Sequence, residues 1–307
     1  MSIDRRRFLK TSIAGVAAIG VGGAMNAYAG SLSVNQAPTY PIKSELKLSF
    51  QEGTAPGANL NEKFDFMEEY GVVGFEPHGG NITNRLPEFK DALKGRGISV
   101  SAICAGFQGF ILSTEESVRN KFRSSMEEII IAAGELESVG VIMVPAFKEQ
   151  VPVMPHNQET RDYLCKELDD LGRFAQRYGT TIILEPLNRK EAFYLRQLSD
   201  AASICRDINN PAVTCLGDFW HMTHEETSDM AACIAAGEYW QHVQMASRKR
   251  RSMPGEDGEA DNYVDGFKGL KLIGYNKYVS FECGCQCDRN IVVPAALKLL
   301  REQWNKA

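Results

Sequence analysis

The sequence predicts an α/β protein that folds as a single closed (β/α)8 barrel, the TIM barrel architecture. Eight short apolar runs alternate with amphipathic stretches, which is the order of strands and helices in a parallel α/β fold. No shift in composition divides these runs into two groups, and the roughly 260 residues that hold them match the size of one such barrel. An open, doubly wound sheet is the alternative, but neither GxGxxG nor GxxxxGKS/T follows the first run.

The predicted strands follow from the apolar runs in chain order. Each run is short and rich in Val, Ile, Leu or Phe, as buried parallel strands are. Two of the segments between them, 117–137 and 160–179, show the apolar period of a helix, and Gly179 stands where a helix C-cap is expected. The eight predicted strands lie at 46–50, 72–76, 98–104, 139–146, 180–185, 212–218, 240–246 and 278–283.

The first 29 residues are predicted to be a twin-arginine export signal. The dipeptide Arg5-Arg6 stands before FLK, and a glycine- and alanine-rich apolar stretch leads to a cleavage site near Ala29. Residues 30–45 are a predicted polar tether, so the barrel is expected at 46–307. The signal predicts an exported, periplasmic protein that uses the twin-arginine machinery and keeps no stable membrane span. An uncleaved anchor is the alternative, but the apolar stretch is too short and glycine-rich to cross a bilayer.

The charge of the chain argues against nucleic acid as a partner. Removal of residues 1–29 takes away Asp4 and four cations, so the formal net charge changes from -5 to -8. An acidic chain is not suited to bind nucleic acid or anionic membranes in general, and a small molecule is the expected ligand. Eight cysteines without CxxC spacing give no indication of a zinc ribbon or a thioredoxin-like centre. Association into a homo-oligomer is left open.

Polar side chains stand at the carboxyl ends of four successive predicted strands. They are Glu185, Asp218, Gln244 and Glu282, each separated from the next by about one strand-loop-helix-loop unit. A closed barrel brings these ends to one face, where barrel enzymes hold their catalytic groups. Carboxylates that share a dry pocket must raise their pKa values or bind a cation. Three carboxylates and one amide oxygen favour a hard or borderline divalent ion such as Mn²⁺ or Mg²⁺.

Four motifs at these positions carry a family resemblance. The segments LEPLNRKE, DFWHM, HVQMASRKRRSMPGEDGE and FECG occur in this order. With them, residues 46–300 resemble the xylose isomerase-like TIM barrels, in particular the branch of ketose 3-epimerases and hydroxypyruvate isomerases. The resemblance implies one divalent metal, with Mn²⁺ favoured and Mg²⁺ or Co²⁺ as alternatives, bound by Glu185, Asp218, Gln244 and Glu282. It also assigns acid/base roles to Glu185 and Glu282.

The third ligand position differs within that family. The ketose 3-epimerases have a histidine where this chain has Gln244, whereas the hydroxypyruvate isomerases resemble it in having glutamine. His242 lies two residues earlier, so both side chains are expected to face into the barrel, one layer apart. Gln244 is nearer the strand end and is the predicted ligand. His242 is predicted to be a buried, hydrogen-bonded interior residue, with metal ligation as the alternative.

Residues next to the ligands are predicted to bind the substrate. His221 lies three positions after Asp218 and is expected to reach a substrate hydroxyl, with Trp220 as an apolar wall. The resemblance implies that Glu191 and Arg251 also contact the substrate.

Two further candidates are less well defined. Arg250 replaces Arg251 if the alignment shifts by one, because this loop has one more residue than the family pattern PGxGE. Glu76 ends the second predicted strand and is expected to line the pocket, with His78 on the same face. His224, one helical turn after His221, is ranked as a neighbour of the site or as solvated.

The predicted chemistry is enolisation of a carbonyl compound. A metal that chelates a carbonyl and the adjacent hydroxyl acidifies the α C–H bond, and carboxylates on its two sides can remove and return the proton. The predicted function is a divalent-metal-dependent sugar or keto-acid isomerase or epimerase that acts through an enediolate, with Glu185 and Glu282 as the acid/base pair. The alternative is a 3-keto-glycoside lyase or hydrolase that uses the same proton abstraction. An exported sugar-binding barrel without turnover is the third interpretation.

The segment ECGCQC remains outside this scheme. Cys283, Cys285 and Cys287 fit a soft-metal site, a disulfide or simple packing at the barrel rim. A narrow cavity walled by Phe107 and Phe110 would favour a small keto acid or a ketose, and an open cleft would favour a glycoside.

Overall fold

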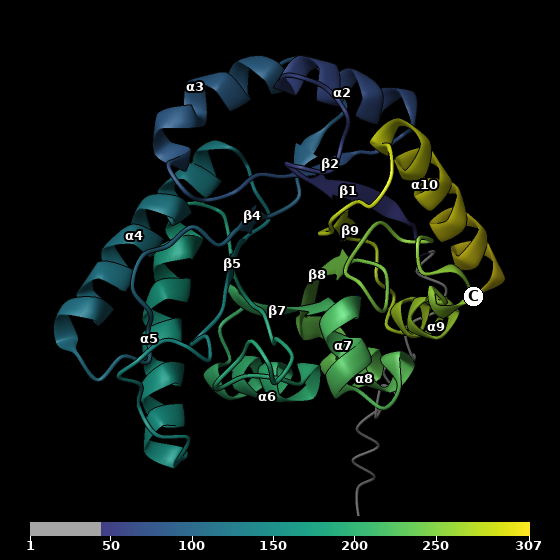
Figure 1. The fold of residues 1–307 in the computed structure, drawn as a ribbon. Coiled ribbons are helices and arrows are strands. Elements are labelled where there is room, and N and C mark those ends of the chain that lie inside the picture. The colour runs from purple at the N-terminus through teal and green to yellow at the C-terminus, as the bar shows by residue number, and fades with distance from the viewer. Residues whose placement is uncertain (1–43) are drawn as a thin grey trace, which may run out of the picture. The chain divides into compact units, whose positions relative to one another are not determined.

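The computed structural model describes residues 44–307, which form a ring of strands with helices around it (Figure 1). The predicted export signal, and the predicted tether up to residue 43, lie outside the described residues, so both stay predictions. Between residues 44 and 307, no helix is both long and apolar enough to cross a membrane.

A sheet of nine strands forms the wall of the barrel, in the order β3-β2-β1-β9-β8-β7-β6-β5-β4. Every pairing between neighbours in this order is parallel, as expected when a helix returns the chain to the start of each next strand. The strands are β1 (Lys47–Gln51), β2 (Gly74–Glu76), β3 (Ser99–Val100), β4 (Ile103–Cys104), β5 (Val141–Met143), β6 (Ile182–Leu184), β7 (Val213–Asp218), β8 (Trp240–Met245) and β9 (Tyr278–Phe281).

The two ends of this sheet meet in one extended run of chain. The predicted strand 98–104 is divided into β3, which pairs with β2, and β4, which pairs with β5. Ser101 N–H donates to the Phe75 carbonyl at 2.8 Å, and Ile103 N–H donates to the Gly140 carbonyl at 2.9 Å. The run therefore turns from one neighbour to the other. All eight predicted strands are present, and the (β/α)8 barrel is confirmed.

Helices cover the outside of the strands (Figure 1). The predicted helices 117–137 and 160–179 correspond to α4 and α5, and Gly179 follows α5 in a left-handed conformation, with φ of 70°. Asn157 caps α5 by accepting the Thr160 N–H. The helices are α2 (Leu60–Glu69), α3 (Ile82–Leu93), α4 (Glu116–Glu135), α5 (Gln158–Arg177), α6 (Leu198–Ile208), α7 (Phe219–Glu225), α8 (Asp229–Ala236), α9 (Val264–Leu272) and α10 (Arg289–Lys306), with 3-10 turns at Gly237–Tyr239 and Gly258–Ala260.

The interior of the barrel is apolar on one side and polar on the other. Ile142, Ile183 and Leu216 form a small apolar cluster that is separate from the main core shared by strands and helices. Buried polar side chains include Ser49, Ser101, Glu76, His242 and Gln244. A buried polar group needs a partner, so this half of the barrel is where bound ligands or hydrogen-bond networks are expected.

We expect Gly217→Ala to destabilise the barrel next to Asp218. A Cβ at Gly217 would overlap the Trp240 ring and lie 2.9 Å from Met222 Sδ, and both of these side chains are buried. Overpacking of this kind costs about 1–3 kcal/mol, measurable as a lower free energy of unfolding in urea. Gly53→Ala is the control, because no heavy atom lies within 4 Å of a Cβ built there. Equal stability of the two variants would contradict the packing seen around β7.

Candidate active site

The four predicted metal ligands lie at the carboxyl ends of β6, β7, β8 and β9. Asp218 and Gln244 are fully buried and are register partners at the ends of β7 and β8. Glu185 follows β6 and is 6% exposed, and Glu282 follows β9. One oxygen each of Glu185 and Asp218 and one nitrogen of His221 all lie within 4.8 Å of one another.

One guanidinium links the acids of this site. Arg251 Nη2 lies 2.9 Å from Glu282 Oε2 and 3.4 Å from Asp218 Oδ2, so these two carboxylates face the same point. Burial, followed by the Glu282 and Asp218 carboxylates, raises the pKa of Glu185 well above its usual range. Burial also raises the pKa of Glu282 to about 7, although Arg251 opposes the change. Arg251 offsets only part of the repulsion among these three carboxylates. A bound divalent ion would reduce that repulsion further.

The side-chain amide of Gln244 has an oxygen without a hydrogen-bond partner. Its Nε2 donates to Glu76 Oε1 at 2.7 Å, and its Oε1 is buried without a hydrogen-bond partner. An unpartnered buried amide oxygen is costly, and it has a lone pair available for a cation. By donor type, the carboxylates of Glu185, Asp218 and Glu282 and this amide oxygen suit a hard divalent metal, whereas the group whose ligand atoms lie within 4.8 Å of one another consists of Glu185, Asp218 and His221.

His221 lies next to Glu185 and Asp218, and its hydrogen bonds to Asn188 fix which ring nitrogen carries the proton. Its Nδ1 faces the Asn188 backbone N–H at 3.1 Å and the Asn188 Nδ2 at 2.9 Å. Because a backbone N–H can only donate, Nδ1 must accept, and the proton of the neutral ring is on Nε2. Burial lowers the pKa of His221, which keeps the ring neutral.

The protonated nitrogen of His221 points at the acids. Nε2 lies 3.5 Å from Asp218 Oδ2 and 4.0 Å from Glu185 Oε1, without a hydrogen-bond partner. Ligation of a metal would require a lone pair on this atom, whereas the arrangement offers an N–H. This tautomer argues against His221 as a metal ligand and leaves its Nε2–H free to donate a hydrogen bond. The role of Asn188 depends on the fold of its loop; its only signal in the sequence was its place within LEPLNRKE.

Arg251, not Arg250, reaches the site. Arg251 has a φ of 53°, and its guanidinium lies 4.6 Å from the centre of the Trp220 ring and 3.7 Å from Glu191. Arg250 instead pairs with Asp257, with Nε 2.5 Å from Oδ1, and its side chain is 51% exposed. The structure thus brings Trp220, Glu191 and Arg251 together above the carboxylates, as the sequence predicts for substrate-binding residues.

Glu76 lies deeper than these residues. It is fully buried and accepts from His242 Nε2 at 2.7 Å as well as from Gln244. Although burial opposes ionisation, hydrogen bonds from His242 and Gln244 lower the pKa of Glu76. The predicted interior position and hydrogen bond of His242 are confirmed. His78 and His224 are exposed, and the His224 ring stands edge-on to Trp220, with centroids 5.2 Å apart.

The three cysteines of ECGCQC and the two phenylalanines take no part in the contacts described above. Cys283, Cys285 and Cys287 are free, and within residues 44–307 they do not form a group whose sulfur atoms converge as metal ligands do. Phe110 is buried in the core, and Phe107 packs edge-on against Phe122, with centroids 5.1 Å apart. These two aromatic side chains are thus held by the core beneath α4.

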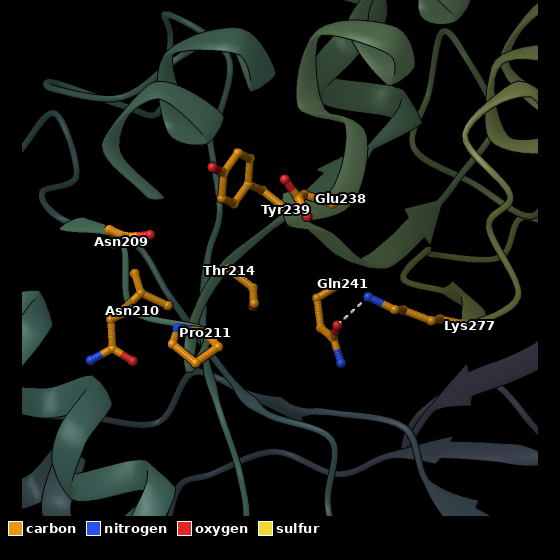
Figure 2. A pocket seen from close by; sticks show the side chains of 9 residues that line it. Asn209, Asn210, Pro211, Thr214, Glu238, Tyr239, Gln241 and Lys277 are labelled. Carbon is orange, nitrogen blue, oxygen red and sulfur yellow. Dashed lines mark hydrogen bonds between the residues drawn. The ribbon is translucent and has the colours of Figure 1, made fainter. Parts of the chain in front are cut away.

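A separate cavity of about 340 Å³ lies at the opposite end of the barrel, where β7, β8 and β9 begin. Figure 2 shows Lys277 donating to Gln241 in this cavity. None of the predicted catalytic, metal or substrate residues lines it, so it is distinct from the candidate active site. Its lining residues are Asn209, Asn210, Pro211, Val213, Thr214, Glu238, Tyr239, Gln241 and Lys277.

Known proteins resemble this chain along most of its length. The 3-dehydro-D-guloside 4-epimerase of Escherichia coli (strain K12) is 30% identical over 243 residues, which is 77% of this chain and 92% of that protein. The crystal structure of the 3-keto-D-glucoside 4-epimerase from E. coli in its apo form has a TM-score of 0.75 and 29% identity, and the match covers 84% of this chain and 100% of that chain.

A solved structure of lower sequence identity has the same fold. The structure of D-psicose 3-epimerase with D-tagatose from Clostridium cellulolyticum H10 has a TM-score of 0.75 at 17% identity, over 84% of this chain and 99% of that chain. The sequence pattern of the xylose isomerase-like TIM barrels matches residues 57–303. The chain therefore belongs to the xylose isomerase-like TIM barrel family.

Proposed function

We propose that this protein is a divalent-metal-dependent epimerase of keto-sugars and that its substrates are 3-keto-glycosides. That it is an enzyme of the isomerase and epimerase class follows from its relatives, which are named as sugar epimerases. The observation that carries the metal dependence is the cluster of two buried acids, Glu185 and Asp218, and the partly buried Glu282 at the barrel end, together with one unpartnered amide oxygen and one arginine.

The proposed reaction comes from one of the two enzymatic interpretations of the sequence, and the proposed substrate comes from the other. One of them predicted epimerisation, and the other predicted a 3-keto-glycoside. The E. coli relative is named as a 4-epimerase of a 3-dehydro-guloside, so it joins that reaction to that substrate class. In such a substrate the C4 proton is adjacent to the C3 carbonyl, and its removal and return on the other face inverts C4 without any other reactant.

The residues of the site can be given roles in this reaction. A divalent metal held by these residues would polarise the carbonyl of the substrate, which would acidify the C–H bond on the adjacent carbon. One of Glu185 and Glu282, in its ionised form, would take the C4 proton from one face, and the other, in its protonated form, would give a proton to the opposite face, so the pair ends with the same number of protons. His221 donates its Nε2–H to a substrate oxygen, because Asn188 keeps Nδ1 as the acceptor. Trp220 and Arg251 cover the sugar from the rim.

Proton NMR in D₂O tests the proposed function. The Mg²⁺-loaded protein is incubated with a methyl 3-keto-glucoside, a ketose and hydroxypyruvate. We expect metal-dependent deuterium incorporation at C4 of the glycoside together with the C4 epimer, and neither after treatment with EDTA. Release of the aglycone would instead support the lyase interpretation. Binding of the glycoside without exchange would support the sugar-binding barrel.

We expect Asp218→Asn to weaken metal binding. Asp218 is fully buried between Glu185, His221 and Arg251, so loss of its charge removes a central anionic ligand. Isothermal titration of EDTA-treated protein with Mn²⁺ should give one site in the parent and an affinity lower by at least about tenfold in the variant, since loss of a residue that only orients a ligand already costs about 10–100-fold. Glu259→Gln is the control, because Glu259 is an exposed loop residue. Equal affinities would contradict the assigned ligand set.

We also propose that the protein is exported through the twin-arginine machinery, on the basis of Arg5-Arg6 and the apolar stretch that follows. This route carries folded proteins, so the metal would be loaded before transport. Self-association remains a proposal without a defined interface.

A further inference from the structure

Glu76 is a buried acid that the proposed reaction does not use. It ends β2, and β1 and β9 lie between β2 and β8 in the sheet. Its side chain crosses the barrel interior to contact two residues of β8 at 2.7 Å, His242 through Oε2 and Gln244 through Oε1. Gln51 also donates to Glu76 Oε1, at 3.3 Å.

The hydrogen bonds from His242 and Gln244 stabilise an ionised Glu76, but its charge acts unfavourably on the other acids of the site. Glu76 is fully buried, and its charge adds to the repulsion that Glu185 and Glu282 already exert on each other. A neutral glutamine would fill the same volume without that charge. The polar half of the barrel therefore contains a fourth acid that works against the other three.

The hydrogen bond between Glu76 and the Gln244 side-chain amide indicates a role for Glu76. The two ends of an amide have nearly the same shape, and a neutral interior would accept either orientation. An ionised carboxylate only accepts hydrogen bonds, so Glu76 selects the Nε2 end of Gln244. The Oε1 end is then forced to face away from Glu76, where it is buried without a partner.

We propose that Glu76 is the positioning residue that makes Gln244 a metal ligand, by holding its amide so that Oε1 faces the metal. His242 anchors Glu76 from below through the other carboxylate oxygen, which leaves Oε1 of Glu76 for Gln244. This inference rests on the proposed metal dependence and replaces the substrate contact that the sequence suggested for Glu76. A residue beyond the ligands that orients them commonly changes metal affinity by about 10–100-fold.

The test is a swap of the two side chains, read by Mn²⁺ affinity rather than by turnover. Metal-stripped mature protein is titrated calorimetrically as wild type, Glu76→Gln, and the double variant Glu76→Gln with Gln244→Glu. In Glu76→Gln the amide of Gln244 loses its selecting acceptor, and we expect the affinity to fall at least tenfold. In the double variant a carboxylate takes the ligand position and an amide donates to it, so we expect most of the lost affinity to return.

The rescue separates orientation from simple stability. If Glu76 only supported the fold, a second buried substitution would not restore the Mn²⁺ affinity. Glu52→Gln is the matched control: Glu52 is a partly buried acid at the same end of the sheet that pairs with Arg85, at 2.6 Å, and it does not contact Gln244. Its Mn²⁺ affinity should equal that of wild type.

Each other outcome overturns the inference in a recognisable way. If Glu76→Gln binds Mn²⁺ as tightly as wild type, or if the double variant binds no better than Glu76→Gln, Glu76 does not orient the ligand. If Glu76→Gln does not fold, the double variant decides alone, because weak binding by a folded double variant contradicts the exchange of roles. If wild type binds no divalent metal, the proposed function fails as well.

Discussion

Glu282→Gln is expected to abolish epimerisation, with kcat lowered by about 10³-fold or more. Positioned proton transfer contributes about 10²–10⁴-fold to such reactions, and Glu282 is assigned both to the metal and to the proton. Glutamine has the same shape, so it preserves packing but cannot take up a proton. The rate is measured by NMR as formation of the C4 epimer, with deuterium incorporation followed in the same sample.

The interpretation of this loss requires that the metal is still bound. Assays at a series of Mn²⁺ concentrations show whether activity returns when the site is saturated. We expect no recovery, because the missing proton acceptor is not replaced by the ion. Glu259→Gln, an exposed acid on the seventh loop, should retain full activity. Wild-type rates of inversion in Glu282→Gln would remove Glu282 from the mechanism and leave it a structural acid.

The fold could be predicted from sequence because barrel strands are short, apolar and separated by a regular length of chain. All eight runs correspond to strands, but the division of 98–104 into β3 and β4 could not be foreseen. It depends on which neighbour each backbone N–H meets, Phe75 for Ser101 and Gly140 for Ile103. That choice is made by closure of the ring, which leaves no mark on side-chain composition.

The candidate site was predictable to the extent that strand ends are predictable. Position along the chain was enough to bring Glu185, Asp218 and Glu282 to one face. It was not enough to orient side chains that meet from different strands. The tautomer of His221 depends on Asn188, 33 positions earlier in the chain, and the amide of Gln244 depends on Glu76, 168 positions earlier.

The choice between two adjacent arginines was a question of backbone conformation. Arg251 is left-handed, and its carbonyl accepts the Gly284 N–H at 2.8 Å, which fixes the loop against the end of β9. Arg250 is directed to Asp257 by the same loop. An extra residue in PGEDGE made the alignment ambiguous, and only the three-dimensional path of the loop decides which guanidinium faces the acids.

Arg251→Ala is expected to tighten metal binding while it weakens catalysis. The guanidinium lies 2.9 Å from Glu282 and 3.4 Å from Asp218, on oxygens that a divalent ion would also use. Binding of the ion must therefore break charge-assisted hydrogen bonds worth about 1.5–3 kcal/mol each. Without the guanidinium this cost disappears, and we expect the Mn²⁺ affinity to rise about tenfold or more by calorimetry at fixed ionic strength.

The same substitution should lower kcat/KM at saturating metal, because we propose that Arg251, whose guanidinium lies over the Trp220 ring, covers the sugar together with Trp220. Arg250→Ala is the matched control: Arg250 pairs with Asp257 and should leave both the metal affinity and kcat/KM unchanged. If Arg251→Ala bound Mn²⁺ less tightly than wild type, the guanidinium would be a support for the carboxylates and not a competitor of the metal. A rise in affinity with a fall in kcat/KM would show that one arginine neutralises the acids until the metal arrives and then serves the substrate.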